Sequence, residues 1–289
     1  MQIWRDMVEE IIFIYSLCHD LLREIGHVDD SQCKMNAAEV MTVALVSAMY
    51  FHGNHNLARR FLKAHHYMRN MLSKSRFNRR VHAIDFDFWQ IVLSVLKSTI
   101  QRGISHFEYV IDSFPVEACQ NVRSYRCKIL KGKSFIGYSS SKKKYYYGVK
   151  VHMITTTSGV PMELIITPAS IADITALKTM QIDILSGSTL YGDKAYSDYV
   201  FEDLLREATE IRLVPQRKTR MKRQHYGPLA YQQEIQRKRI ETTFSQISQL
   251  FPKCITAVTQ RGFIMKILLF IIGYVIGIVF RDRALAKSC

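Results

Sequence analysis

The chain has 289 residues, is strongly basic, and has enough apolar residues for a folded core. It contains 40 Lys and Arg against 25 Asp and Glu, which gives a formal net charge of +15, and 48% of its residues are hydrophobic. This hydrophobic content excludes a mostly disordered chain, and the length allows one large or two ordinary domains. The excess of cations favours a phosphate-rich partner such as nucleic acid, or an anionic membrane surface.

The chain up to about residue 105 has the periodicity of helices. Asn36, with Glu39 three residues further on, predicts a capping box, and Ser73 or Ser75 is expected to start the fourth helix. The predicted helices cover residues 4–25, 37–51, 56–72 and an apolar run that continues through 88–96. We therefore expect an all-α N-terminal domain over residues 1–105 that binds DNA.

After residue 105 the pattern changes to strands. The predicted strands are 107–112, 145–156, 160–168, 188–193 and 210–215. Ser158 and Gly159 are expected to form the turn between the second and third strands. Helices are predicted over 173–185, with Asp173 as N-cap, and over 198–208. Three strands in a meander, followed by alternating helices and strands, predict a mixed α/β sheet with flanking helices, in a domain of residues 106–289.

Three carboxylates stand at informative positions of this second domain. Asp112 and Asp193 are predicted to end the first and fourth strands, and Glu241 lies on a helix-like stretch. If the two strands are neighbours, the two Asp side chains converge at one edge of the sheet. Pro115 is expected to stop the first strand. Carboxylate oxygens are suitable ligands for Mg²⁺ or Mn²⁺. A pair of such ions can stabilise the attacking and the leaving oxygen when a phosphodiester bond is cleaved or formed. The acids therefore predict metal-dependent cleavage and joining of DNA.

Lys and Arg gather in blocks that are nearly free of acids. Residues 40–84 and 118–162 contain no Asp or Glu, and 212–239 contain only Glu234. Such blocks favour contact surfaces for a polyanion. In the first block we expect arginines to contact DNA, and a fragment of roughly the first hundred residues to bind it. These residues are Arg59, Arg60, Arg69, Arg76, Arg79 and Arg80.

Several cations near the acids have two interpretations each. Lys150 and His152 alternate along one strand, so they share one face, which is either exposed or directed at the phosphate of the substrate. Arg237 lies one helical turn before Glu241, as a simple ion-pair partner or as a group that holds both Glu241 and a phosphate. Lys194 is either a phosphate contact or a solvated side chain.

The cysteines and the termini favour a cytoplasmic protein. The six cysteines form no C-x-x-C pair, so we expect reduced thiols. The acidic residues of MQIWRDMVEE argue against a secretion signal. The apolar run 263–280 is just long enough to span a membrane, with Arg261 before it and Arg281 after it. We expect it instead to be a buried helix that packs on the sheet, which makes membrane association improbable.

Five segments together resemble a known family. They are DSFPVEACQNVR, YGVKVH, TSGVPMELIITPAS, LYGDKAY and the R-x-x-x-E of Arg237 and Glu241. The combination resembles bacterial insertion-sequence transposases of the DDE class, most closely the insertion-sequence family numbered 982, over nearly the whole chain including SKSRFNRRVH. Related transposases often have Tyr and Lys where this chain has Glu234 and Ser248, which leaves open which residues of this helix touch the DNA ends.

The resemblance implies an RNase H-like catalytic domain in which Asp112, Asp193 and Glu241 bind two Mg²⁺ ions, or Mn²⁺, per active site. It implies cleavage at the ends of a mobile element and attack of the freed 3′-OH on target DNA. The implied partners are the terminal inverted repeats, target DNA and further copies of the chain on DNA, with no small-molecule cofactor and a location at the bacterial nucleoid.

Two alternatives remain at this point. One is a transposase-derived DNA-binding protein without catalysis, which metal-dependent nicking would distinguish. The other is a membrane-associated basic protein, which fractionation without detergent would test.

Overall fold

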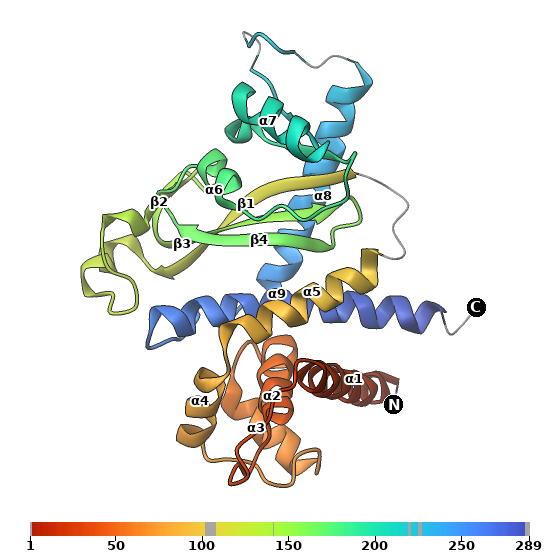
Figure 1. Cartoon of the computed structure of the whole chain (residues 1–289). Coiled ribbons are helices and arrows are strands. Elements are labelled where there is room, and N and C mark those ends of the chain that lie inside the picture. Colours follow the sequence, from red (N-terminus) through yellow and green to blue (C-terminus); the bar gives the residue numbers. More distant parts are fainter. Residues whose placement is uncertain (1, 102–107, 141, 219–220, 225–226, 287–289) are drawn as a thin grey trace. The chain divides into compact units, whose positions relative to one another are not determined.

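The computed structural model describes residues 2–101, 108–140, 142–218, 221–224 and 227–286. The chain divides into two compact units (Figure 1). The first comprises Met1–Arg102, Ile247–Ala257 and Arg261–Cys289, and the second comprises Gly103–Gln246 and Val258–Gln260. The boundary at residue 102 lies close to the predicted change at 105. The C-terminal residues, however, return to the first unit and do not stay with the sheet.

The first unit is helical, with the bounds α1 Gln2–Glu24, α2 Ala37–Tyr50, α3 His55–Ala64, α4 Lys74–Ala83, α5 Phe86–Gln101 and α9 Gln260–Ala286. The capping box of α2 is confirmed: Glu39 N donates to Asn36 Oδ1 at 2.7 Å, and Asn36 N donates to Glu39 Oε2 at 2.9 Å. Ser73 is the N-cap of α4, as expected. The predicted third helix is too long, because α3 ends at Ala64 and His66 adopts a φ of 60°.

Helix α9 is buried within the first unit. Gly273 and Gly53 allow close packing, because a Cβ at either would lie 2.8 Å from Met49 Cγ or Phe270 Cζ respectively. Phe270 also lies 4.8 Å from Phe251, between ring centroids. The prediction that this helix packs on the sheet is therefore wrong. An apolar run all round a helix indicates burial without indicating which partner covers it.

Among the described residues α9 is the one helix long and apolar enough to cross a membrane, by length and composition. In this structure 67% of that apolar stretch is buried, which is also typical of a core helix.

The second unit is built on a six-stranded mixed sheet in the order β2-β3-β1-β5-β6, with β4 also paired to β3. The strands are β1 Glu108–Cys119, β2 Ile136–Ser139, β3 Lys144–Thr156, β4 Pro161–Pro168, β5 Thr189–Gly192 and β6 Arg212–Pro215. β1 is antiparallel to β3 and parallel to β5, and β5 is parallel to β6. The helices are α6 Asp173–Thr179, α7 Tyr199–Thr209 and α8 Pro228–Leu250, the last of which continues into the first unit. This is an RNase H-like fold.

Strand β1 is longer than predicted, because Pro115 does not end it. β1 pairs with β5 only as far as Ile111, whereas its pairing with β3 continues to Cys119. Pro115 therefore lies where β1 has lost its β5 neighbour, so a missing N–H leaves no bond to that strand unmade. The predicted turn is confirmed: Gly159 has a φ of 88° and its N–H donates to Thr156 O at 2.9 Å.

Helix α8 covers one face of this sheet. Gln233 Nε2 donates to Val214 O on β6 at 2.8 Å, and Thr243 Oγ1 donates to Gly159 O in the β3–β4 turn at 3.2 Å. Between these points the rings of Phe114 and Phe244 lie 4.6 Å apart. Since successive strand side chains alternate between faces, Asp112 shares the α8 face with Phe114, and Ser113 lies on the opposite face with α6.

Candidate active site

Asp112 and Asp193 lie next to each other on neighbouring parallel strands. Ile111 of β1 and Gly192 of β5 are register partners. Asp112 directly follows Ile111 in the sequence, and Asp193 directly follows Gly192. The two strands are neighbours, which is the condition under which the two acids were expected to converge. Asp112, however, lies within β1 and does not end it. A Cβ at Gly192 would lie 3.2 Å from Ile111 Cγ2, so the glycine permits the close approach of these strands.

The two carboxyl groups are partly removed from water. Burial raises the pKa of Asp112 to about 7, with Asp193 and Asp173 adding to the rise, while the Ser113 N–H and Arg237 oppose it. Burial also raises the pKa of Asp193, in which Asp173 again adds to the rise. The hydroxyl of Tyr196 is fully buried near the same acids, and its pKa lies well above 10. Burial is the largest cause of all three rises, so the site disfavours the charged forms of these groups in the absence of a cation.

Arg237 and Glu241 approach this pair from α8. Asp112, Asp193, Gln233, Arg237 and Ile240 line one small recess. Arg237 Nε donates to Glu241 Oε1 at 3.2 Å, and both side chains are about half-exposed. Glu241 lies one helical turn after Arg237 and is not among the residues that line the recess. Among the residues that the structure describes, no three His, Cys, Asp or Glu side chains are grouped closely enough to hold a metal ion.

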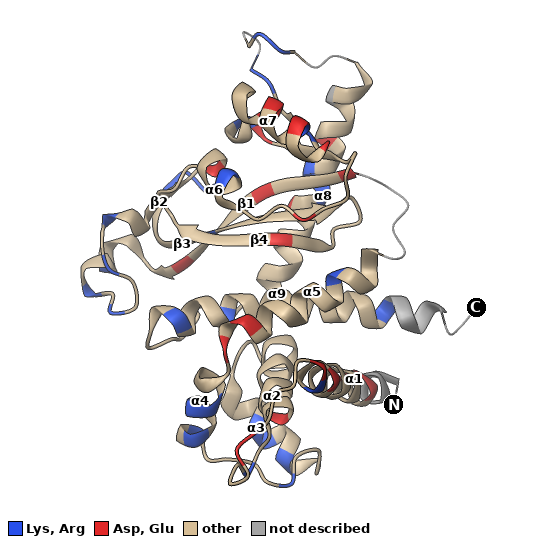
Figure 2. Ribbon diagram, viewed as in Figure 1, with Lys and Arg blue, Asp and Glu red and all other residues tan. Residues whose placement is uncertain are grey.

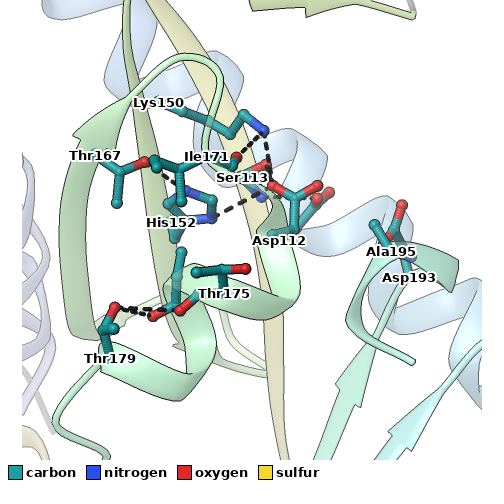
Figure 3. Close-up of polar contacts among 12 residues, drawn as sticks. Asp112, Ser113, Lys150, His152, Thr167, Ile171, Thr175, Thr179, Asp193 and Ala195 are labelled. Carbon is teal, nitrogen blue, oxygen red and sulfur yellow. Dashed lines mark hydrogen bonds and ion pairs between the residues drawn. The ribbon is translucent and has the colours of Figure 1, made fainter. Parts of the chain in front are cut away.

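A second cluster contains Ser113, Lys150 and His152, which Figure 3 labels, and Asp173 of α6, with which all three interact. Asp173 Oδ1 accepts from Ser113 Oγ at 3.0 Å and from Lys150 Nζ at 3.1 Å, and lies 3.5 Å from His152 Nδ1. Lys150 Nζ also donates to Ile171 O at 3.0 Å. We call these four residues, Asp173, Ser113, Lys150 and His152, the Asp173 cluster.

The Asp173 cluster corrects two predictions. Asp173 is not an N-cap: Ala172 occupies that position, and the Asp173 side chain makes no capping hydrogen bond. Lys150 and His152 share a face, as expected, but it is not an exposed one. His152 is fully buried with its pKa lowered to about 4 by burial, and Nε2 is 3.0 Å from Thr167 Oγ1. In this arrangement His152 cannot reach a DNA phosphate.

The arginines of the first unit fall into two groups. Arg59 donates to Asn56 Oδ1 at 2.9 Å and to the Leu72 carbonyl, and Arg80 donates to Asp29 Oδ1 at 2.7 Å. Both guanidinium groups are therefore committed to the fold. The others predicted to contact DNA, Arg60, Arg69, Arg76 and Arg79, are exposed. Figure 2 shows the basic residues of α4 as blue bands along the helix.

Residues 212–239 show the same partition between structural and exposed cations. Arg217 is buried and forms a two-pronged ion pair with Glu202, and Arg223 pairs with Asp203 at 2.7 Å. Both acids come from α7, so a block that contains a single acid in the sequence is partly neutralised in space. Lys194, next to Asp193, is exposed.

The chemistry of the site suits a hard divalent cation. Asp112 and Asp193 have carboxylate oxygens, which hard divalent cations prefer as ligands. Burial, with a smaller contribution from Asp193, raises the pKa of Asp112 to about 7, and a bound cation would favour its charged form. Glu241 lies on the same helix one turn after Arg237 and pairs with it. Asp112 and Asp193, which line one recess, are the residues that would hold a metal ion here, whereas the Glu241 carboxylate accepts from Arg237 and does not line that recess.

The second unit thus combines an RNase H-like sheet, two acids on adjacent strands, and a helix that brings Arg237 to the same recess. A family model described as a transposase DDE domain matches residues 101–253, which is more than half of the chain. The chain therefore belongs to the DDE transposases. No curated protein and no solved structure matched it. The finer assignment to the family numbered 982 stays a prediction.

Proposed function

We propose that this chain cleaves DNA at the ends of a mobile element and transfers the freed strand into target DNA, with Asp112, Asp193 and Glu241 as metal-binding triad. The observation that carries the proposal is the pairing of Asp112 and Asp193 on neighbouring parallel strands, with Arg237 of α8 in the same recess. The partners would be the terminal repeats and target DNA, bound by an oligomer of this chain.

The residues of the site have separate tasks in this proposal. Bound Mg²⁺ or Mn²⁺, as one or two ions, supplies an activated water and stabilises the attacking and leaving oxygens. Asp112 and Asp193 would hold the cation as carboxylates, and its positive charge would offset the burial that raises the pKa of each. Arg237, about half-exposed, releases Glu241 and is then free to face a phosphate. No Ser or Cys nucleophile is needed.

The test compares triad variants with a control on the same helix. Asp112→Asn, Asp193→Asn and Glu241→Gln each remove a charged ligand with little change of volume. Glu234→Gln is the matched control, because Glu234 is also exposed on α8 and pairs with a cation one turn away, Lys238 at 3.1 Å. The measurement is nicking of plasmid DNA that carries the coding region with its flanking sequence, in Mg²⁺ and in EDTA.

Cleavage should fall by about a thousandfold or more in each triad variant while DNA binding persists, because ligand loss acts on the chemical step. Glu234→Gln should cleave at the wild-type rate. A triad variant that keeps the wild-type rate would remove that residue from the proposed site. Wild-type protein that binds DNA but never nicks it would instead favour a DNA-binding protein without catalysis.

A further inference from the structure

The first unit contains an open hollow beside α4. It encloses about 430 Å³ between the loop that precedes α2, residue Leu72 and one side of α4. This volume is within the range of sites that bind small organic ligands. The residues of its wall that carry the following argument are Lys34, Met35, Leu72, Arg76, Arg79 and Ala83.

The hollow combines an apolar floor with a cationic rim. Met35 and Leu72 are buried, with exposed fractions of 1% and 9%. Lys34, Arg76 and Arg79 are exposed around them. No Asp or Glu is among the residues that line it.

Arg80 also lines the hollow but does not add to its free charge. Its guanidinium donates to Asp29 Oδ1 at 2.7 Å and to Met35 O at 3.2 Å, which neutralises it and fixes the wall. Asp29 is itself held by the Ala37 N–H at 2.8 Å, and these bonds keep its pKa below the ordinary value although burial opposes them. Three cations, of Lys34, Arg76 and Arg79, are therefore left for a ligand.

We propose that this hollow binds one nucleotide of a DNA strand whose base is unpaired. The base would lie on Met35 and Leu72, and the phosphates on its two sides would face Arg76, Arg79 and Lys34. A base in a duplex is stacked and paired and cannot enter a hollow of this kind, so the ligand is single-stranded or extruded. A DNA strand has one phosphate on each side of every nucleotide. Two phosphates can pair with several cations placed around the rim, whereas a single small anion can reach fewer of them. The inference rests on the proposed function, since that function supplies DNA as the partner.

The test fills the hollow without changing its charge. Ala83 is the last residue of α4 and is exposed, so Ala83→Phe places a ring in the hollow. Ala64→Phe is the matched control, because Ala64 is the exposed last residue of the basic helix α3 and does not line the hollow. Full-length proteins are compared for binding to a single-stranded oligonucleotide, to the same sequence as a duplex, and to AMP.

Ala83→Phe should weaken binding of the single strand by about tenfold and leave duplex binding within about twofold of wild type. Ala64→Phe should change neither. The proposal is overturned if the affinity of Ala83→Phe for the single strand stays within about twofold of the wild-type affinity. If AMP binding is lost in Ala83→Phe while strand binding is not, the hollow is a site for free nucleotides and the DNA strand is the wrong source.

These outcomes are separable from a failure of the proposed function. A protein that binds neither the single strand nor the duplex removes DNA as the partner and defeats both proposals. A protein that nicks DNA in Mg²⁺ but whose single-strand binding ignores Ala83→Phe defeats this one alone. Equal thermal melts of Ala83→Phe and Ala64→Phe show that the comparison is between folded proteins.

Discussion

Asp112 gives the metal-free protein a pH-dependent stability. Its pKa is about 7 in the folded chain, against an ordinary value of 3.8. Between these two pH values the carboxyl group of Asp112 is deprotonated in the unfolded chain and still protonated in the folded chain. The stabilising contribution is therefore complete below about pH 4 and is lost as pH rises through about 7.

We expect Asp112→Asn, which does not titrate, to melt at a higher temperature than wild type at pH 8 in EDTA, and to lose this advantage near pH 4. Thermal melts across that range measure the difference. Mg²⁺ should raise the melting temperature of wild type at pH 8 and have little effect on the variant. A wild-type protein that is the more stable of the two at pH 8 without metal would contradict the raised pKa.

Asp173 stabilises the fold through its ion pair with Lys150. Lys150 and Asp173 are mostly buried, with side-chain exposed fractions of 18% and 21%. Asp173→Asn leaves Lys150 without its anion and should destabilise the protein by about 2 kcal/mol. Urea denaturation measures this loss. The double variant Asp173→Leu with Lys150→Met, which removes both charges, should recover part of the stability. If the double variant is as unstable as the sum of its two single variants, the two side chains are not coupled.

At the scale of single residues, the sequence identifies the two acids that the sheet brings together. It does not identify the charged residues whose side chains bond to other parts of the protein. Asp112 and Asp193 follow apolar runs that the strand pattern predicts well. Asp173, Arg59 and Arg80 each have a partner far away in sequence: Lys150, Leu72 and Asp29. Pairings of this kind depend on the tertiary structure, so a block without acids in the sequence can still be neutralised in space.

At the scale of elements, the β1–β3 pair contains an irregularity near the end of β1, beyond Asp112. The pairing shifts between Glu117 and Cys119, opposite Gly148 of β3. A Cβ at Gly148 would lie 2.1 Å from Val116 O. No side chain can be added there without moving β1 away from β3, because the obstacle is backbone.

Gly148→Ala should therefore destabilise the second unit by about 3 kcal/mol. The control is Gly187→Ala, also in the second unit, where a Cβ meets nothing within 4 Å and only a φ of 76° is strained. That variant should lose about 1 kcal/mol. Denaturant melts compare the two, and equal losses would mean that β1 and β3 separate easily at the shift.

The element boundaries show which local signals can be trusted. The capping box at Asn36 and the turn at Gly159 are where predicted, because both are made by neighbouring residues. The extension of β1 through Pro115 was not predicted, since it depends on where β5 stops. Strand β2, Ile136–Ser139, was also missed; it is short and pairs with residues 144–147 of β3.

At the scale of the whole molecule, the first unit is made from both ends of the chain. Helix α9 contributes fully buried residues such as Phe263, Ile271 and Ile276, and it packs on Met49 of α2. A fragment of residues 1–102 lacks this helix. The expectation that such a fragment binds DNA stays a prediction, and the fragment would expose the side of α2 at Met49 on which α9 packs.

We expect the fragment 1–102 to lack a cooperative thermal transition, and a fusion of residues 1–102 to 247–289 through a flexible linker to regain one. Circular dichroism melts test this. Deletion of residues 260–289 from the full chain should unfold the first unit and leave the second unit protected from hydrogen exchange. If that deletion leaves the first unit folded and removes a need for detergent, α9 is a membrane anchor.

The division of the first unit between distant segments sets the order in which the protein can mature on the ribosome. Residues 247–289 are translated after the whole RNase H-like sheet, so α2 lacks the part of its packing that α9 supplies, at Met49, during most of synthesis. The nascent chain is thus a substrate for chaperones until its last helix emerges. If translation stops before residue 247, we expect the released chain to contain the complete sheet with Asp112 and Asp193 on paired strands, but an incomplete first unit.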